Sequence, residues 1–78
     1  MQPVELYPGI SSHQGILGGK PVITGTRVPV DLVLGQLASG MSQEEVACEY
    51  HLTPEQIRAA LGYAARRLSE EVVYVTSE

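Results

Sequence analysis

Two capping boxes in the second half of the chain constrain the fold more than any other feature of this sequence. Ser42 is followed three residues later by Glu45, and Thr53 is followed in the same way by Gln56. In such a box the hydroxyl accepts a hydrogen bond from a backbone N–H of the first helical turn, and the Glu or Gln side chain bonds back to the cap. Pro54 then takes the first helical position, where its missing N–H costs nothing. The sequence predicts one helix after Ser42, a short turn, and another helix from Pro54.

An apolar segment before Ser42 predicts a further helix, which Gly40 ends. Its apolar surface is wider than one face, so we expect it to be central to the core; the residues are Leu32, Val33, Leu34, Leu37 and Ala38. On the last helix, apolar residues at helical spacing predict a buried stripe that runs to roughly Leu68; they are Ile57, Leu61, Ala64 and Leu68. Gly62 costs roughly 1 kcal/mol in a helix interior, which predicts close packing there by another helix.

The first thirty residues hold most of the glycine and proline, and β-branched residues between them predict short strands. Gly25 stands where a positive φ would turn the chain, and Val28 precedes Pro29, which disfavours helix. We expect Val22, Ile23 and Val28 to form the buried side. The predicted fold is a single, mainly α domain: an N-terminal β arm or hairpin over 1–29, a three-helix helix-turn-helix bundle over 30–70 and a tail over 71–78. A ribbon-helix-helix fold is a minor alternative that leaves the third helix unexplained.

Composition narrows the class of protein. A chain of 78 residues forms one domain that buries only about 60% of its unfolded surface, so oligomerisation would stabilise it. The net charge of −4 disfavours non-specific binding to nucleic acid. A single cysteine excludes an internal disulfide. The sequence has neither a long apolar run nor an export leader, so we expect a cytoplasmic protein that does not enter membranes.

Three kinds of active or ligand site are disfavoured. Gly19-Lys20 resembles the end of a phosphate-binding loop, but Gln14 and Pro21 stand where that motif needs a glycine and a hydroxyl residue. Cys48 and His51 have metal-like spacing, although a small buried cysteine and an exposed turn histidine are the simpler interpretation. No base stands beside a candidate nucleophile. We expect no enzyme, no metal, no cofactor and no small-molecule substrate.

Helix-turn-helix logic assigns DNA contact to the first turns of the last helix. The residues are Thr53, Glu55, Gln56, Arg58 and Ala59, of which Arg58 is the most capable donor. Lys20 and Arg27 are additional candidates for phosphate contact. For Arg27 we expect first a bond that ties the N-terminal segment down through a carbonyl or a carboxylate. Arg66 is expected to pair with Glu70 on the helix surface.

The tail residues Val72, Val73, Tyr74 and Val75 form an apolar run that predicts either a covered strand or a continuation of the last helix. An uncovered apolar edge promotes aggregation, so these residues are predicted to bind a partner. The partner is the segment from Val4 to Leu6, a second copy of the chain, or another protein.

The string GGKPVITGTR, from Gly18 to Arg27, is followed by Val28-Pro-Val and later by LASGMSQEEVACEYHLTPEQIRAALGYAA. This combination closely resembles the small bacterial proteins of domain-of-unknown-function family 433, over residues of about 10 to 68. The resemblance implies a homeodomain-like helix-turn-helix fold. For many members it implies an antitoxin role in a VapBC-like pair whose toxin is a PIN-like ribonuclease. Members often have a longer, proline-containing turn between helices two and three, where this chain has only His51-Leu52.

Two functions follow as hypotheses. In the first, the protein is an antitoxin that binds its toxin through the C-terminal region and binds its own operator DNA as a homodimer. In the second, it is a small dimeric interaction module that binds no nucleic acid. The acidic net charge favours the second hypothesis, and the family resemblance favours the first.

Overall fold

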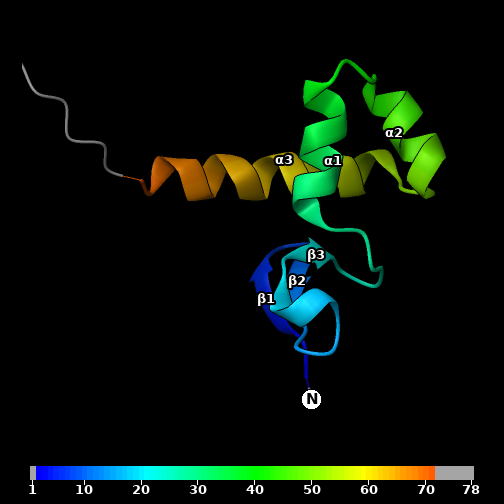
Figure 1. The fold of residues 1–78 in the computed structure, drawn as a ribbon. Helices are drawn as coiled ribbons and strands as arrows, with labels where there is room; N and C mark the ends of the chain where they lie inside the picture. Colours follow the sequence, from blue (N-terminus) through cyan, green and yellow to red (C-terminus); the bar gives the residue numbers. More distant parts are fainter. Residues whose placement is uncertain (1, 72–78) are drawn as a thin grey trace, which may run out of the picture.

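The computed structural model describes residues 2–71, which form a small antiparallel sheet followed by three helices (Figure 1). The strands are β1 (Val4–Tyr7), β2 (Ile10–Ser12) and β3 (Val22–Ile23), with a short 3₁₀ turn, η1, at Leu17–Gly19. The helices are α1 (Val30–Ala38), α2 (Gln43–Tyr50) and α3 (Pro54–Ser69). The predicted order of short strands and then three helices is confirmed. The predicted tail, Val72–Val75, lies outside the described residues.

Both capping boxes are formed, and they start α2 and α3 where the sequence predicts. The Glu45 N–H donates to Ser42 Oγ at 3.0 Å, and the Ser42 N–H donates to the Glu45 carboxylate at 2.8 Å. The Thr53 and Gln56 pair repeats this pattern at 3.1 and 2.8 Å. Between the helices His51 adopts a left-handed conformation with φ 58°, which ends α2 and turns the chain toward α3.

The sheet is paired within one chain. β2 lies in the middle, with β1 and β3 antiparallel to it on either side. The outer side of β3 is occupied by the returning chain, because the Ile23 N–H donates to the Val28 carbonyl and the Val30 N–H donates to the Pro21 carbonyl, each at 3.0 Å. Gly25 makes this return with φ 84°, as predicted. Since both sides of β3 have partners, the ribbon-helix-helix alternative, which pairs this strand across a dimer, is wrong.

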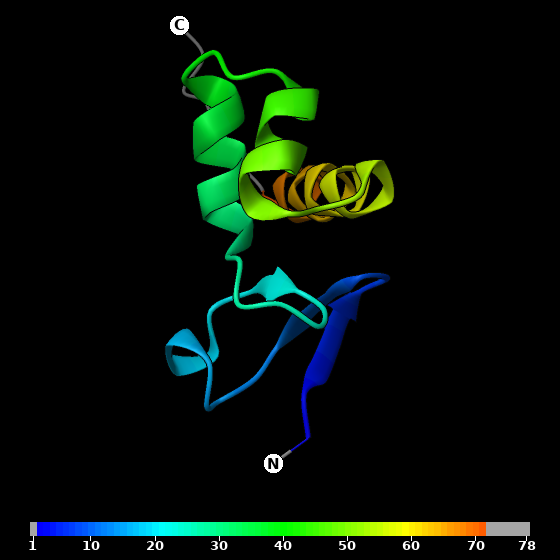
Figure 2. The same cartoon turned by 90° about the vertical axis from the view of Figure 1, so that its right-hand side faces the viewer.

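Sheet and helices share one hydrophobic core. Ile10 of β2 and Ile23 of β3 are fully buried in the same cluster as side chains from every helix; the helical members include Val30, Val33, Val46, Ile57 and Ala60. Figure 2 shows the sheet lying against one side of the helical layer. The N-terminal segment is therefore a wall of the core rather than an arm appended to a helical bundle.

The buried stripe predicted for α3 is partly wrong. Ile57 and Ala60 are buried, but Leu61 is 36% exposed and Leu68 is 64% exposed. Only the first half of α3 crosses α1 and α2, and its last turns extend beyond both helices (Figure 1). A stripe with helical periodicity was present in the sequence, but nothing in the sequence set how far along α3 the other helices reach.

Gly62 has a different neighbour from the one predicted. The ring of Tyr7, from β1, lies on it, so that a Cβ added at Gly62 would be 2.9 Å from Tyr7 Cζ. The same ring makes an edge-on contact with Tyr63, with the ring centroids 6.3 Å apart, and the Arg66 guanidinium lies 5.7 Å from its centroid. Gly62 does allow a close approach, but to an aromatic ring of the sheet rather than to another helix.

Candidate functional site

The residues predicted to read DNA are largely occupied by contacts within the protein. The side chains of Thr53 and Gln56 form the capping box of α3. Ala59 is half-buried beneath the β1–β2 turn, where a Cβ on Gly9 would lie 3.0 Å from Ala59 Cβ. Arg58 is exposed. Among the five predicted DNA-contact residues, Arg58 and Glu55 are thus exposed and have no part in the capping box, and Arg58 is the one that carries a positive charge.

The surface around α2 and the start of α3 is acidic. α2 contributes three glutamates, Glu44, Glu45 and Glu49, and no lysine or arginine. The first turn of α3 adds Glu55. Glu55 lies three residues before Arg58 on α3, and carboxylates on this part of the surface repel the phosphates of a nucleic acid and weaken binding driven by counterion release.

Two of the other basic residues form ion pairs on the surface. Lys20 Nζ lies 2.8 Å from Asp31 Oδ2, and Arg67 Nη1 lies 3.3 Å from Glu70 Oε1. The hydrogen bond from Lys20 lowers the pKa of Asp31 below its usual value. The predicted Arg66–Glu70 pair is wrong, because Arg67 takes this glutamate and Arg66 lies over the Tyr7 ring.

Arg27 does not form the predicted tie. Its side chain is exposed and makes no hydrogen bond or ion pair with any residue in 2–71. Its neighbour Thr26 holds the turn instead: the Thr26 hydroxyl donates to the Ile23 carbonyl at 2.7 Å and accepts from the Val28 N–H at 3.0 Å. Because the Thr26 hydroxyl forms the hydrogen bonds that stabilise the turn, the Arg27 guanidinium is not needed for them and faces solvent.

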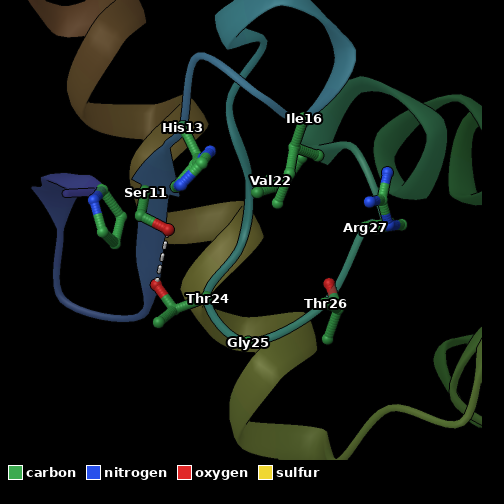
Figure 3. Close-up of a pocket in the computed structure, with 9 residues that line it drawn as sticks. Ser11, His13, Ile16, Val22, Thr24, Gly25, Thr26 and Arg27 are labelled. Atoms are coloured by element: carbon green, nitrogen blue, oxygen red, sulfur yellow. Dashed lines mark hydrogen bonds between the residues drawn. The ribbon is translucent and has the colours of Figure 1, made fainter. Parts of the chain in front are cut away.

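Arg27 stands at the rim of a cleft of about 450 Å³ between β2, β3 and the turn that follows them (Figure 3). Ser11 and Thr24 meet at one side of this cleft, where the Thr24 hydroxyl donates to Ser11 Oγ at 3.1 Å. His13 lies nearby, with its Nδ1 accepting from the Gly15 N–H at 2.9 Å. The apolar part of the wall includes Val22.

The sequence interpretation missed Ser11 and His13 as lining residues. They lie far from Arg27 along the chain and come near it only because β2 pairs with β3. The run Ile10-Ser11-Ser12 contains no signal that distinguishes a cleft wall from an ordinary strand. Thr24, Gly25 and Arg27, by contrast, belong to the motif that stands out in the sequence.

Cys48 is exposed rather than buried, which corrects the sequence prediction. On α2 the buried residue is Val46, and a residue two positions later points to the opposite side of the helix. His51 is exposed in the turn, as predicted. Within residues 2–71 no group of three His, Cys, Asp or Glu side chains is placed to hold a metal ion. No helix in this range is both long and apolar enough to cross a membrane.

Comparison with protein families places these features in a known group. The model of the family described as "Protein of unknown function (DUF433)" matches residues 10–64. The chain belongs to the DUF433 family. The match begins at β2 and ends within α3, so it contains both capping boxes, the Lys20–Asp31 ion pair and the residues that line the cleft other than Pro3.

Two similar proteins extend the comparison. The chain is 45% identical over 56 residues to "Uncharacterized protein y4eO" of Sinorhizobium fredii (strain NBRC 101917 / NGR234), a match that covers 70% of this chain and 25% of the relative. It also resembles the crystal structure of Rv2018 from Mycobacterium tuberculosis, with a TM-score of 0.61, 38% identity and coverage of 67% of this chain and 24% of that chain. The DUF433 chain described here thus matches about a quarter of the length of each.

Proposed function

We propose that this DUF433 protein is the antitoxin of a type II toxin–antitoxin pair and that it binds a PIN-like ribonuclease through the projecting half of α3. The observation that carries the proposal is the exposed apolar stripe on these turns. Leu61 and Leu68 lie seven residues apart, with the exposed Ala65 between them on the same helix face. An amphipathic helix that lays such a face into a groove is a common mode of protein recognition.

Charge supports a ribonuclease as the partner. An enzyme that binds RNA presents a basic surface to phosphates, and a chain of net charge −4 complements such a surface. The predicted partner-binding residues, Val72–Val75, follow α3 after Glu70 and Glu71 in the sequence and are apolar. Both features favour a binding role over catalysis.

The finer part of the fold proposal is that α1, α2 and α3 form a homeodomain-like helix-turn-helix. It is supported by the short turn at His51 and by the two capped helix starts on either side of it. In a homodimer this unit would bring Arg58 to operator DNA, with Lys20 and Arg27 as additional phosphate contacts. The capped side chains and the surrounding glutamates make this the weaker part of the antitoxin proposal.

Co-expression with the adjacent reading frame tests the main proposal. We expect a nuclease-like neighbour to copurify with the wild-type protein and to lose ribonuclease activity in the complex. Leu61→Glu with Leu68→Glu should abolish copurification while the melting temperature changes little. Leu17→Glu is the matched control, because Leu17 is also exposed but lies in η1, away from α3. An absent complex in the wild type, or equal loss with the control, would contradict the proposal.

The second candidate, a dimeric interaction module without nucleic-acid binding, is favoured by the capping role of Thr53 and Gln56 and by Glu55 beside them. A gel shift against the DNA upstream of the gene, at low salt, separates the two. Specific retardation that is lost in Arg58→Ala would exclude the module. No retardation at any salt concentration would exclude operator binding while leaving toxin binding to the copurification test.

A further inference from the structure

The cleft beside β3 contains more hydrogen-bond donors than the described residues use among themselves. Arg27 offers a guanidinium that forms no hydrogen bond or ion pair with residues 2–71. Ser11 and Thr24 share one hydrogen bond, which uses only one of their two hydroxyl protons, although Ser11 is only 6% exposed. The pair therefore retains an O–H donor at the cleft wall.

No acceptor of matching charge is built into this wall. Within residues 2–71, neither aspartate nor glutamate lines the cleft. The Thr26 hydroxyl is already used, because it both donates to Ile23 and accepts from Val28. Thr26 therefore holds the turn on which Arg27 stands. Among the described residues that line the cleft, Arg27 is the one lysine or arginine, in a protein that is acidic overall.

From this arrangement we propose that the cleft binds a small carboxylate with a short apolar body. A guanidinium matches a carboxylate through two parallel hydrogen bonds. One arginine balances one negative charge, whereas a polyanion would meet the repulsion of a chain with net charge −4. Val22, Ile16 and Pro3 supply an apolar wall against which a short aliphatic group can pack.

Two sources offer this chemistry: a free carboxylic acid and the C-terminal carboxylate of a polypeptide. Both present the same head group to Arg27. The cleft lies beside the sheet, whereas toxin binding is proposed for α3. Carboxylate binding in the cleft is therefore independent of toxin binding. A negative result for carboxylate binding would not contradict toxin binding, and a negative result for toxin binding would not contradict carboxylate binding.

The test is an NMR titration of the full chain, in which backbone amide shifts are followed at pH 7. Butyrate should shift the amides of Thr24, Gly25 and Arg27 in a saturable way, and the uncharged butyramide should bind at least about tenfold more weakly. A short N-acetylated peptide with a free C-terminus, compared with its amidated form, shows whether the polypeptide source binds more tightly than butyrate. Inorganic phosphate is the competing anion.

Substitutions locate the site. Arg27→Gln should weaken butyrate binding at least about tenfold, which is about 1.4 kcal/mol. Arg27→Lys keeps the positive charge but cannot form the two parallel hydrogen bonds of a guanidinium, so it should lose less butyrate affinity than Arg27→Gln. It replaces Arg27→Gln in the test if the glutamine variant folds poorly. Arg58→Gln is the matched control, an exposed arginine on α3 outside the cleft. Equal binding of butyramide, tighter binding of phosphate, no saturable shift, or indifference to both Arg27 variants would each overturn the proposal.

Discussion

The ring of Tyr7 lies directly on Gly62, and this contact joins the edge strand β1 to the middle of α3. It places an aromatic ring where a Cβ at position 62 would otherwise lie. Tyr63, the next residue, and Arg66, one turn further along α3, contact the same ring, so one tyrosine connects the sheet to three positions of the helix. The helix and the sheet therefore depend on each other through this contact.

Gly62→Ala should have opposite effects in two backgrounds. In the wild type the new methyl group displaces the Tyr7 ring, and we expect a loss of about 1 kcal/mol in the free energy of unfolding. In a Tyr7→Ala background the ring is absent, and the better helix propensity of alanine should stabilise the protein by about 0.5–1 kcal/mol. Denaturant unfolding of the four variants measures this. If Gly62→Ala changes the free energy of unfolding with the same sign in both backgrounds, the Tyr7 contact is not the reason for a glycine at position 62.

Thr53→Ala should destabilise the protein by about 1 kcal/mol, because it removes the acceptor for the Gln56 N–H at the start of α3. Thr53→Ser keeps the hydroxyl and is the control; it should stay within a few tenths of a kcal/mol of wild type. Urea unfolding followed by circular dichroism gives both values. If alanine and serine behave alike, the capping box contributes less than its geometry indicates.

Ile23→Ala should cost about 2–5 kcal/mol, as expected for a fully buried isoleucine in a well-packed core. For a domain this small such a loss is a large part of the total stability. Val4→Ala, on the exposed side of β1, is the comparison and should change stability little. A small effect of Ile23→Ala would mean that the helices fold without the sheet, and that the N-terminal segment is an arm after all.

The Lys20–Asp31 pair predicts a weak dependence of stability on pH at the acid end. The pKa of Asp31 is lowered in the folded protein, chiefly by its hydrogen bond to Lys20, so the contribution is present above the unfolded pKa and is lost as the pH falls through the folded pKa. Both side chains are largely exposed, which limits this contribution to less than about 1 kcal/mol. Carbon-detected NMR titration should show the pKa of Asp31 rising in Lys20→Gln; an unchanged pKa would contradict the pairing.

Arg27→Ala should leave the melting temperature nearly unchanged, because the side chain is exposed and bonds to no residue in 2–71. Thr26→Val should cost about 1–3 kcal/mol, since it leaves the Val28 N–H and the Ile23 carbonyl without their hydroxyl partner. Calorimetry measures the melting temperatures of the two variants. A large loss in Thr26→Val alone would show that Thr26 stabilises the turn and that Arg27 does not. A large loss in Arg27→Ala would return Arg27 to a structural role.

Local signals in the sequence determined the helix starts and the turn of the N-terminal segment. Capping boxes act within one helical turn, so Ser42 and Thr53 mark the beginning of α2 and α3 whatever packs around them. Gly25 likewise needs only its own backbone conformation to turn the chain. These predictions depend on residues a few positions apart, which is the range over which a single sequence is informative.

Tertiary structure alone decided which faces are covered. The periodicity of α3 allowed a stripe through Leu61 and Leu68, but α1 and α2 reach only its first half and leave both leucines exposed. Gly62 indicated a close neighbour without naming Tyr7, and Ser11 met Thr24 only through the pairing of β2 with β3. Contacts between residues far apart in the chain depend on how the elements are arranged in space, and a local pattern in one sequence does not contain that arrangement.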